Sequence, residues 1–530
     1  MPDIVLATLN AKFIHAAFGL RYLFANLGGL QPRAAIAEFD INQRPLDIAE
    51  ALLARAPGIL GLGVYIWNVA ETTAVVAAIK RVRPDLTIVL GGPEVSYETE
   101  GQELVRLADH VITGEGDLKF AEVCRELLGD AAAPPAGNGH APSRAPLPKI
   151  IPAGPPDFSR LALPYDFYTD ADIAHRIIYV EASRGCPFTC EFCLSSLDIP
   201  VRAVPLESFL AAMQTLLDRG LKQFKFVDRT FNLNIATSKA ILQFFLERHR
   251  HGLFLHFEMI PDRLPEPLRE VIALFPRGAL QFEVGIQTFD ENVARNISRR
   301  QDYTRLADNL QFLRQNTGVH IHADLIAGLP GETWDSFAAG FDRLLALGPQ
   351  EIQVGILKRL RGTPIIRHDA AFRMVYGAHP PYEILQNNLL DFPALQSLRR
   401  FARFWDLVGN SGNFLQTTPL LCGTQPSAFA AFMKWSDWLY ARAGRRHSIA
   451  LDRLAQWLFE YLTVECALSA SSVAETIWSD WQRAGRREKP AFLSNYISMD
   501  DSQPPRPKSE APKRQARHLS LTQLPPSMGS

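Results

Sequence analysis

Short apolar runs alternate with amphipathic segments in two series along this 530-residue chain. The first series, before residue 129, contains runs such as DIVLATL, GILGLGVY and LTIVLGG. The second series, after residue 157, contains runs such as IIYVEASR, ALQFEVGIQT and VHIHADLIAG. Apolar strands that alternate with helices build parallel sheets with crossover helices. The sequence therefore predicts an α/β protein with a doubly wound parallel sheet of five strands, followed by a partial (β/α)6 barrel.

Composition divides the rest of the chain. Residues 129–157 are rich in proline, alanine and glycine, which predicts a linker. Residues 371–497 have the apolar spacing of helices, which predicts a mainly helical C-terminal region. Residues 498–530 are proline-rich and mildly basic, which predicts a disordered tail. The predicted folded domains are then 1–128, 158–370 and 371–497.

The charge balance argues against two classes of partner. The 55 Lys and Arg residues nearly equal the 56 Asp and Glu residues, so no excess charge attracts nucleic acid or an anionic membrane surface. No apolar run is long enough to cross a bilayer, and the first residues, MPDIVLATLN, lack a signal-peptide pattern. Six cysteines in so long a chain do not make a disulfide scaffold. The sequence predicts a cytoplasmic protein with reduced thiols and neither a membrane nor a nucleic-acid partner.

Glycine-rich segments follow the strands of the first series. Ligands of doubly wound sheets bind beyond the carboxyl ends of the strands, where the segments TLNAKF, VYIWN, GGPEVSY and TGEGD fall. Glycines in these segments would let the backbone approach a bulky ligand closely. They are Gly91, Gly92, Gly114 and Gly116.

Three of the six cysteines crowd into the segment SRGCPFTCEFC, at positions 186, 190 and 193. A zinc site usually takes four ligands, and no second cysteine or histidine pair lies near this triplet. A [4Fe–4S] cluster suits three thiolates better, because the fourth iron then stays open for a substrate or cofactor. Cys186, Cys190 and Cys193 are therefore the predicted metal ligands.

The C-x3-C-x2-C spacing, with the aromatic Phe192 before the last cysteine, resembles the signature of the radical SAM superfamily. The resemblance implies that S-adenosylmethionine (SAM) chelates the open iron and that Phe192 lies at the SAM site. It also implies that an electron from the cluster cleaves SAM to a 5'-deoxyadenosyl radical, which abstracts hydrogen from a substrate. The source of the electron would be a reductant such as flavodoxin or ferredoxin.

Three further segments resemble one branch of this superfamily, which contains the anaerobic coproporphyrinogen enzymes. They are GIQTFDENVARNISRR, HADLIAGLPGET and LHFEMIPD. A zwitterionic ligand with a ribose diol needs acidic acceptors and a cation beside its carboxylate, and these segments supply both. The implied SAM contacts are Glu258, Gln287, Arg299 and Asp324, with Asp228 after the second barrel strand as a further candidate.

The N-terminal sheet, placed before such a barrel, resembles the cobalamin-binding domain of the B12-dependent radical SAM proteins. The implied cobalamin contacts are Thr8, Asn10, Gly91, Gly92, Pro93, Glu94, Gly114, Glu115 and Gly116. The D-x-H-x-x-G motif, whose histidine binds cobalt in many B12 proteins, is absent. His15 lies near the end of the first strand, where we expect a surface or capping role. The prediction is cobalamin without a histidine ligand, and the alternative is a sheet that has lost the cofactor.

With both cofactors bound, the resemblance implies methyl transfer to an unactivated centre of a small-molecule or metabolite substrate. Two other functions remain open. The first is a cobalamin-assisted rearrangement, ring or C–C bond reaction without methylation. The second is an iron–sulfur redox or sensor protein that uses the cluster without turnover. Formation of 5'-deoxyadenosine would separate the enzymes from the sensor, and a methylated product would separate the two enzymes.

Overall fold

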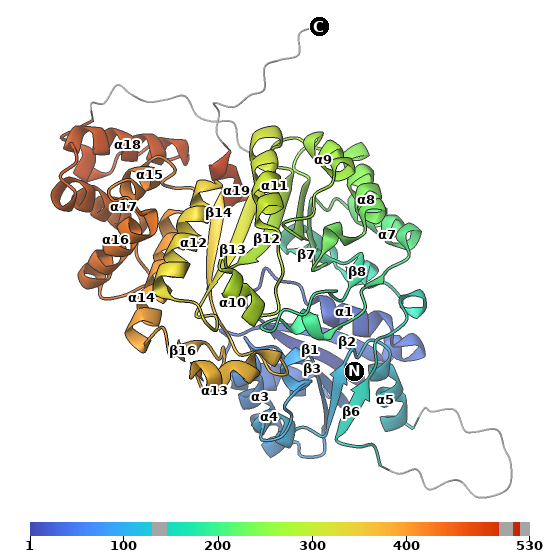
Figure 1. Ribbon diagram of the computed structural model, residues 1–530. Coiled ribbons are helices and arrows are strands. Elements are labelled where there is room, and N and C mark those ends of the chain that lie inside the picture. Colours follow the sequence, from blue (N-terminus) through green and yellow to red (C-terminus); the bar gives the residue numbers. More distant parts are fainter. Residues whose placement is uncertain (130–145, 498–511, 520–530) are drawn as a thin grey trace, which may run out of the picture. The chain divides into compact units, whose positions relative to one another are not determined.

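The computed structural model describes residues 1–129, 146–497 and 512–519 (Figure 1). The chain divides into two compact units. The first unit comprises Met1–Asp228, Lys358–Pro364 and Gly377–Glu383, and the second comprises Arg229–Leu357, Ile365–Tyr376 and Ile384–Ser530. This division falls within the range predicted for the barrel, between its second and third strands. The predicted domain boundaries stay predictions.

The first unit contains a parallel sheet of six strands in the order β2-β1-β3-β4-β5-β6. The chain runs outward from β1 in both directions, so the sheet is doubly wound as predicted. Its strands are β1 (Ile4–Asn10), β2 (Ala34–Asp40), β3 (Ile59–Gly63), β4 (Thr87–Gly91), β5 (His110–Gly114) and β6 (Ile150–Ala153). Its helices are α1 (Phe18–Ala25), α2 (Pro45–Leu53), α3 (Val69–Val82), α4 (Glu103–Leu107) and α5 (Lys119–Leu127).

Alternate residues of β1 pack into two different cores. Val5 and Leu9 belong to the core that α2 and α3 cover, whereas Leu6 belongs to the core that α1 and α5 cover. Successive side chains of a strand point to opposite faces, so a strand buried on both faces is apolar throughout. All seven residues of β1 are buried, which explains the unbroken run IVLATL.

Strand β6 corrects the prediction of a five-stranded sheet. It pairs in parallel with β5, although its residues fall in the range predicted as a linker. The proline-rich surroundings concealed the short apolar run at Ile150 and Ile151. Pro152 is tolerated because β6 is an edge strand, with no further neighbour that needs its amide. Residues 130–145 of the predicted linker lie outside the described residues.

The first unit continues with the segment that carries the cysteine triplet. Its strands are β7 (Ile178–Val180), β8 (Ser183–Arg184), β9 (Arg202–Ala203) and β10 (Gln223–Phe226), and its helices are α6 (Asp170–His175) and α7 (Leu206–Asp218). Strand β10 pairs in parallel with β7, as expected for consecutive barrel strands. Strands β8 and β9 form a short antiparallel pair at the base of the cysteine loop.

Four parallel strands of the second unit pair in chain order, β11 to β14. They are β11 (Phe254–Met259), β12 (Leu280–Gln287), β13 (His320–Ala327) and β14 (Glu351–Ile356). The connecting helices are α8 (Ile235–Glu247), α9 (Glu266–Ala273), α10 (Glu291–Asn296), α11 (Tyr303–Asn316) and α12 (Trp334–Ala346). All six predicted barrel strands are therefore present, two in the first unit and four in the second.

A helical region follows in the second unit, as predicted. Its elements are α13 (Asp369–Phe372), β15 (Val375–Tyr376), β16 (Ile384–Gln386), α14 (Phe392–Val408), α15 (Thr417–Cys422), α16 (Ala428–Ala443), α17 (Leu451–Glu460) and α18 (Ala470–Arg483). Aromatic rings join α12, α14 and α16, because Phe341 lies edge-on to Phe401 of α14 at 4.9 Å and to Phe429 of α16 at 5.9 Å. Such contacts are typical of a packed core.

Helix α19 (Lys513–His518) falls within the range predicted as a disordered tail. Arg514 lies 2.9 Å from Glu351 and 2.7 Å from Asp406, so tertiary ion pairs hold a segment that composition alone marked as unstructured. The rest of the tail prediction, residues 498–511 and 520–530, lies outside the described residues. Within the part of the chain that the structure describes, no helix is long and apolar enough to cross a membrane.

Candidate functional site

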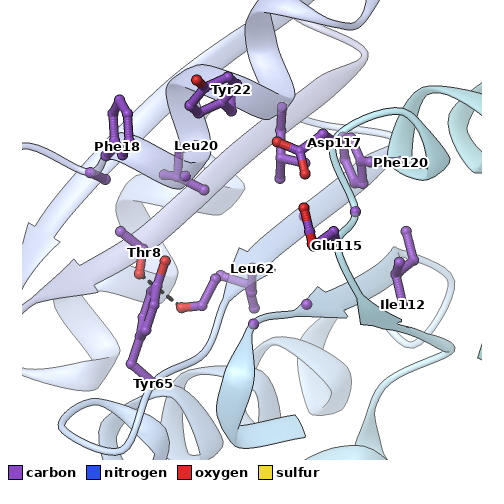
Figure 2. Close-up of a pocket in the computed structure, with 18 of the residues that line it drawn as sticks. Thr8, Phe18, Leu20, Tyr22, Leu62, Tyr65, Ile112, Glu115, Asp117 and Phe120 are labelled. Atoms are coloured by element: carbon purple, nitrogen blue, oxygen red, sulfur yellow. Dashed lines mark hydrogen bonds between the residues drawn. The ribbon is translucent and has the colours of Figure 1, made fainter. Parts of the chain in front are cut away.

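A cavity of about 610 Å³ lies in the first unit, beyond the carboxyl ends of β1, β3, β4 and β5. Figure 2 shows its walls: Thr8 from β1, Phe18, Leu20 and Tyr22 from α1, Leu62 and Tyr65 from β3 and the segment after it, and Phe120 from α5. This is the place where doubly wound sheets bind ligands, beside the point at which the strand order reverses. The volume lies within the ordinary range of cofactor and ligand pockets.

An aromatic pair lines one part of this cavity. The rings of Tyr65 and Trp67 stack with their centroids 4.4 Å apart and their planes 6° apart. Tyr65 is half-buried, and removal of its hydroxyl from water raises the pKa of that group. Trp67 is 46% exposed, so a large flat apolar surface borders the opening.

Two glycines at the strand ends have backbone conformations that suit glycine. Gly92 has φ +108°, and a Cβ there would overlap the carbonyl oxygen of Val64. Gly114 has φ +81°, and a Cβ there would overlap the carbonyl oxygen of Ala153. The backbone therefore approaches its neighbours closely at both positions, and no side chain enters the cavity from either residue.

Seven of the nine predicted cobalamin contacts line this cavity; Pro93 and Glu94 do not. Glu94 is 4% exposed, and its carboxylate accepts hydrogen bonds from Arg361 at 2.9 Å and Tyr382 at 2.7 Å. Thr8 donates to the carbonyl oxygen of Gly63 at 2.8 Å, and Asn10 donates to Glu38 at 3.0 Å. The polar side chains at the end of β1 therefore already have protein partners.

The loop after β5 carries two carboxylates, Glu115 and Asp117, that line the cavity (Figure 2). Arg184 Nη1 lies 2.6 Å from Glu115 and 3.0 Å from Asp117. Arg184 Nη2 lies 2.6 Å from Glu181. Burial raises the pKa of Glu181, although the charge of Arg184 opposes that effect. Charge-assisted bonds of this length are the strong ones, so Arg184 is firmly held.

The cysteine loop begins directly after Arg184. Its amide hydrogen bonds run from Cys186 to the carbonyl oxygen of Asp198 at 3.0 Å, and from Cys193 to that of Cys190 at 3.1 Å. Cys186 and Cys190 are buried, Cys193 is half-buried, and the thiols of this described loop form no disulfide. Phe192 is half-buried. The main chain therefore gathers the three thiols in one compact loop.

Within residues 1–129, 146–497 and 512–519, no three His, Cys, Asp or Glu side chains are placed to share a single metal ion. A [4Fe–4S] cluster makes a different demand, because its thiolates bind separate irons. Three soft sulfur donors in one loop have the donor chemistry of such a cluster. The residues present therefore fit an iron–sulfur cluster better than a single ion.

Two more residues of the first unit have positions relevant to the predictions. Asp228, at the end of β10, accepts hydrogen bonds from the amide of Ala182 at 3.0 Å and the hydroxyl of Ser183 at 2.7 Å. Burial raises the pKa of Asp228 to about 7. His15, for which we expect a surface or capping role, is half-buried and lines the cavity, and its Nδ1 lies 2.6 Å from the hydroxyl of Tyr179. Burial lowers the pKa of His15 and favours the neutral ring.

The second unit brings three of the six predicted SAM contacts, Gln287, Arg299 and Asp324, together around Gly285. Arg299 donates to the carbonyl oxygen of Gly285, and a Cβ on Gly285 would overlap the Gln287 side chain and approach Arg299. Gln287 has φ +72°, at an irregular step in the pairing of β12 with β13. Burial raises the pKa of Asp324, and the hydrogen bond and charge of His322, and less strongly the charge of Arg299, oppose that effect. Glu258, on β11, pairs instead with Arg229 at 2.8 Å.

Gln287 has the features of a ligand-binding side chain. Its Oε1 atom is buried and accepts no hydrogen bond within the structure. A buried acceptor without a partner costs free energy, and a left-handed backbone conformation in a residue other than glycine adds strain. Both costs are compensated if a ligand donates to Oε1, as the ammonium or ribose hydroxyls of SAM could.

A second ion network joins side chains of β13 and β14. His320 Nε2 lies 2.8 Å from Glu351 Oε1, and His322 lies 3.4 Å from Glu351 Oε2 and 3.3 Å from Asp324. Burial would raise the pKa of Glu351, but the hydrogen bonds from His320 and His322 outweigh it and lower that pKa. Burial would lower the pKa of His322, but Asp324 and Glu351 raise it to about 10.

Comparison with protein families gives three matches along the chain. The B12 binding domain matches residues 4–124, and the Radical SAM superfamily matches residues 180–344. The chain is a radical SAM protein with a B12-binding domain. In this radical SAM protein, residues 370–519 match a family described as a protein of unknown function, DUF4080. The assignments imply an iron–sulfur cluster, SAM and cobalamin as cofactors, as predicted.

Two curated relatives resemble this radical SAM protein over part of their length. An uncharacterized methyltransferase of Pyrococcus horikoshii is 26% identical over 312 residues, which cover 55% of this chain and 65% of the relative. The 2-(S-pantetheinyl)-carbapenam-3-carboxylate methyltransferase of Streptantibioticus cattleyicolor is 25% identical over 372 residues, which cover 65% of this chain and 53% of the relative. The chain therefore spans less than two thirds of the length of these relatives.

Two solved structures share the fold of this radical SAM protein. The radical SAM methyltransferase TsrM from Kitasatospora setae has a TM-score of 0.53 at 17% identity, over 73% of this chain and 80% of that one. The cobalamin-dependent radical SAM enzyme OxsB has a TM-score of 0.59 at 13% identity, over 95% of this chain and 82% of that one. At these identities the likeness concerns the fold alone.

The residues that line the cavity suit cobalamin through their apolar surface and through the glycines at the strand ends. A broad apolar wall suits a corrin ring, and backbone without side chains at Gly92 and Gly114 leaves room along the strand ends. Four residues outside the predicted contacts also line the cavity: Tyr65, Trp67, Glu181 and Arg184. The two aromatic residues of the strand-end segment VYIWN are the sequence signal that points to the first two.

Proposed function

We propose that this protein is a cobalamin-dependent radical SAM methyltransferase, which transfers a methyl group to an unactivated centre of a small-molecule substrate. The observation that carries the proposal is the position of Arg184. Its guanidinium group binds two carboxylates of the cofactor cavity, and its backbone leads directly into the cysteine loop. One unit of the protein thus offers places for both kinds of cofactor. The methyltransferase names of the two relatives support methylation as the reaction.

The cysteine loop would hold the cluster through Cys186, Cys190 and Cys193. When bound, the cluster and SAM supply one-electron cleavage of the sulfonium, and cobalamin supplies a transferable methyl group. The electron would come from a small redox protein such as flavodoxin or ferredoxin. The protein contributes the positions of the cofactors and the exclusion of water from the reacting atoms.

Gln287, Arg299 and Asp324 would bind SAM in the second unit. Gln287 Oε1 offers an acceptor to the ammonium group or the ribose, and Arg299 offers a cation to the carboxylate. Asp324, whose carboxylate lies 3.3 Å from His322, offers a further acceptor to the ammonium group or the ribose hydroxyls. In the cavity of the first unit, the aromatic wall would exclude water from the corrin face.

An isotope experiment tests the proposal. A deletion strain and its parent are grown on methionine with a deuterated methyl group, and their metabolites are compared by mass spectrometry. The expected result is a metabolite with the heavy methyl group that is present in the parent and absent from the deletion strain. That metabolite's unmethylated form, given to the purified protein with SAM, hydroxocobalamin and a reductant, should be methylated while 5'-deoxyadenosine forms.

The same assay separates the other functions. Formation of 5'-deoxyadenosine with an altered but unmethylated product would indicate a rearrangement, ring or C–C bond reaction. A reducible cluster without 5'-deoxyadenosine would indicate a redox or sensor protein. A Cys186→Ala variant is the control, because its product formation should equal that of the assay without protein.

A further inference from the structure

Glu115 connects the cofactor cavity to both ends of the cysteine loop. Its Oε2 atom lies 2.6 Å from Arg184 Nη1 and 3.1 Å from Arg202 Nη1, and its Oε1 atom binds Arg202 Nη2. Arg184 is the last residue before the loop, and Arg202 is the first residue of β9 after it. The two arginines face each other across the β8–β9 pair. A single carboxylate therefore fastens both ends of the loop.

The other carboxylates of this network bind one arginine each. Asp117 and Glu181 bind Arg184, and Asp198 binds Arg202 at 2.6 Å. Among the described ion pairs, Glu115 is the carboxylate that Arg184 and Arg202 share. Removing the charge of Glu115 would therefore remove the electrostatic link between Arg184 and Arg202. Removing the charge of Asp117 would leave that link intact.

The position of Glu115 depends on the sheet that forms the cavity. Glu115 follows β5 directly, between Gly114 and Gly116, and all three residues line the cavity. The backbone of Gly114 packs against Ala153 of β6 so closely that a Cβ would not fit. A ligand that presses on this loop would move Glu115, and Glu115 would carry both arginines with it.

The network is buried enough that a movement of Glu115 would shift Arg184 and Arg202. The side chains of Glu115 and Arg184 are each 20% exposed, and that of Arg202 is 17% exposed. Bonds between partly buried charges are screened little by salt and are roughly twice as strong as neutral hydrogen bonds. The guanidinium group of Arg184 is further confined between the rings of Tyr22 and Phe158, at 5.0 and 5.1 Å.

We propose that Glu115 is a positioning residue that couples occupancy of the cavity to the cysteine loop through Arg184 and Arg202. The proposal rests on the proposed function in one respect, because it takes cobalamin as the occupant of the cavity and a cluster as that of the loop. Its consequence is reciprocal. If the cluster changes the affinity for cobalamin by some factor, cobalamin changes the affinity for the cluster by the same factor.

The test measures this coupling in the full-length protein under anaerobic conditions. The dissociation constant of hydroxocobalamin is determined for cluster-loaded protein and for a Cys186→Ala, Cys190→Ala, Cys193→Ala variant without cluster. We expect the two constants to differ by about fivefold or more, the usual lower size of a coupling between sites. In a Glu115→Gln background the ratio should fall to about one. In a Glu115→Asp background, which keeps the charge but shortens the reach, it should be intermediate.

A spectroscopic measurement tests the same coupling by observing the cluster while cobalamin is added. In excess dithionite, which keeps the cluster reduced and converts added hydroxocobalamin to its Co(II) form, the EPR signal of the cluster should shift in the wild-type protein but not in Glu115→Gln. The matched control is Glu122→Gln, whose carboxylate is 54% exposed on α5 and pairs with Lys119. A second control, Val75→Ala, loosens the core that α2 and α3 cover in the same unit and should keep the wild-type ratio.

Several outcomes would overturn the proposal. A ratio of about one in the wild-type protein would exclude coupling, and an unchanged ratio in Glu115→Gln would exclude Glu115 as its carrier. If the ratio of the two dissociation constants also falls in Val75→Ala, the effect of Glu115→Gln reflects a general loss of stability and not the loss of this contact. If neither hydroxocobalamin nor a cluster binds the wild-type protein, the proposed function fails too. If both bind without influence on each other, the coupling alone is wrong.

Discussion

The ion network around Arg184 in the first unit and the network around Glu351 in the second unit differ in their cations. Arginines bind the carboxylates of the first network, and an arginine stays charged at every pH at which proteins are folded. In the second network His320 and His322 bind Glu351 beside Arg514. Histidine changes charge within the range of ordinary experiments. The first network can therefore serve as a fixed support, whereas the second responds to pH.

The largest effect expected is the loss of the cluster from the loop that the first network supports. Changing Cys186, Cys190 or Cys193 to Ala should abolish the iron–sulfur absorption, its EPR signal and SAM cleavage together. The circular dichroism of the protein should not change, because hydrogen bonds and ion pairs hold the loop. A cubane cluster that persists in the triple variant would contradict the assignment. Replacing Cys124, Cys422 and Cys466 together is the control and should leave the iron content unchanged.

The next effect is a loss of stability on breaking the first network. Arg184→Gln leaves Glu181 and Asp117 buried without their cation, which should lower the free energy of unfolding by about 3 kcal/mol. Urea titration measures this change. Arg83→Gln is the matched control, because Arg83 forms an exposed pair with Asp85 that should contribute little. If both variants lose the same free energy of unfolding, the buried network stabilises the protein no more than the exposed pair does.

The contribution of the second network to the free energy of unfolding should depend on pH. The folded protein raises the pKa of His322 to about 10, so the protonated ring is favoured in the folded state. This contribution is complete below about pH 6.5, the value of an unperturbed histidine, and is lost as the pH rises through about 10. Replacing His322 with Gln should therefore cost a few kcal/mol at low pH and less at high pH.

Urea titrations of the wild-type protein and the His322→Gln variant across this pH range measure the effect. The cost of Arg184→Gln should stay constant between about pH 8 and pH 10, because arginine does not titrate there. If the cost of His322→Gln does not fall with rising pH, His322 is neutral in the folded protein and the distinction between the networks is lost.

The smallest effect expected is none at all. Cobalamin bound without a histidine ligand should show no nitrogen hyperfine splitting in the EPR signal of its reduced Co(II) form. His15→Ala should leave this signal unchanged, although His15 is a histidine of the cavity wall, because its Nδ1 is engaged with Tyr179. Splitting from one nitrogen that disappears in His15→Ala would show that His15 binds cobalt.

Local patterns in the sequence predicted the fold well. The central strands β1, β3 and β4 of the first sheet are buried on both faces, so each is a largely apolar run that can be recognised without its neighbours. Strand β6 and helix α19 escaped prediction because pairing with β5 and ion pairs with Glu351 and Asp406 hold them. Such contacts form between residues far apart in the chain, and composition does not reveal them.

The candidate site was predictable to a similar extent. The cysteine spacing and the glycines at the strand ends are short-range signals, and the structure places them at a loop and at a cavity wall. Glu115 was predicted to contact cobalamin, but its carboxylate binds two arginines that lie 69 and 87 residues further along the chain. No local pattern identifies partners at that distance. The sequence thus predicted the place of Glu115 but not its contacts.

The pairing of β8 with β9 has a consequence for the order of events in the cell. Backbone hydrogen bonds close the cysteine loop at its base and within it, between Cys186 and Asp198. Small zinc domains, by contrast, fold only when their metal arrives. For this protein we therefore expect that the chain folds first and receives its iron and sulfide later. Maturation would then be limited by that delivery, and apoprotein released by the ribosome could wait in a competent form.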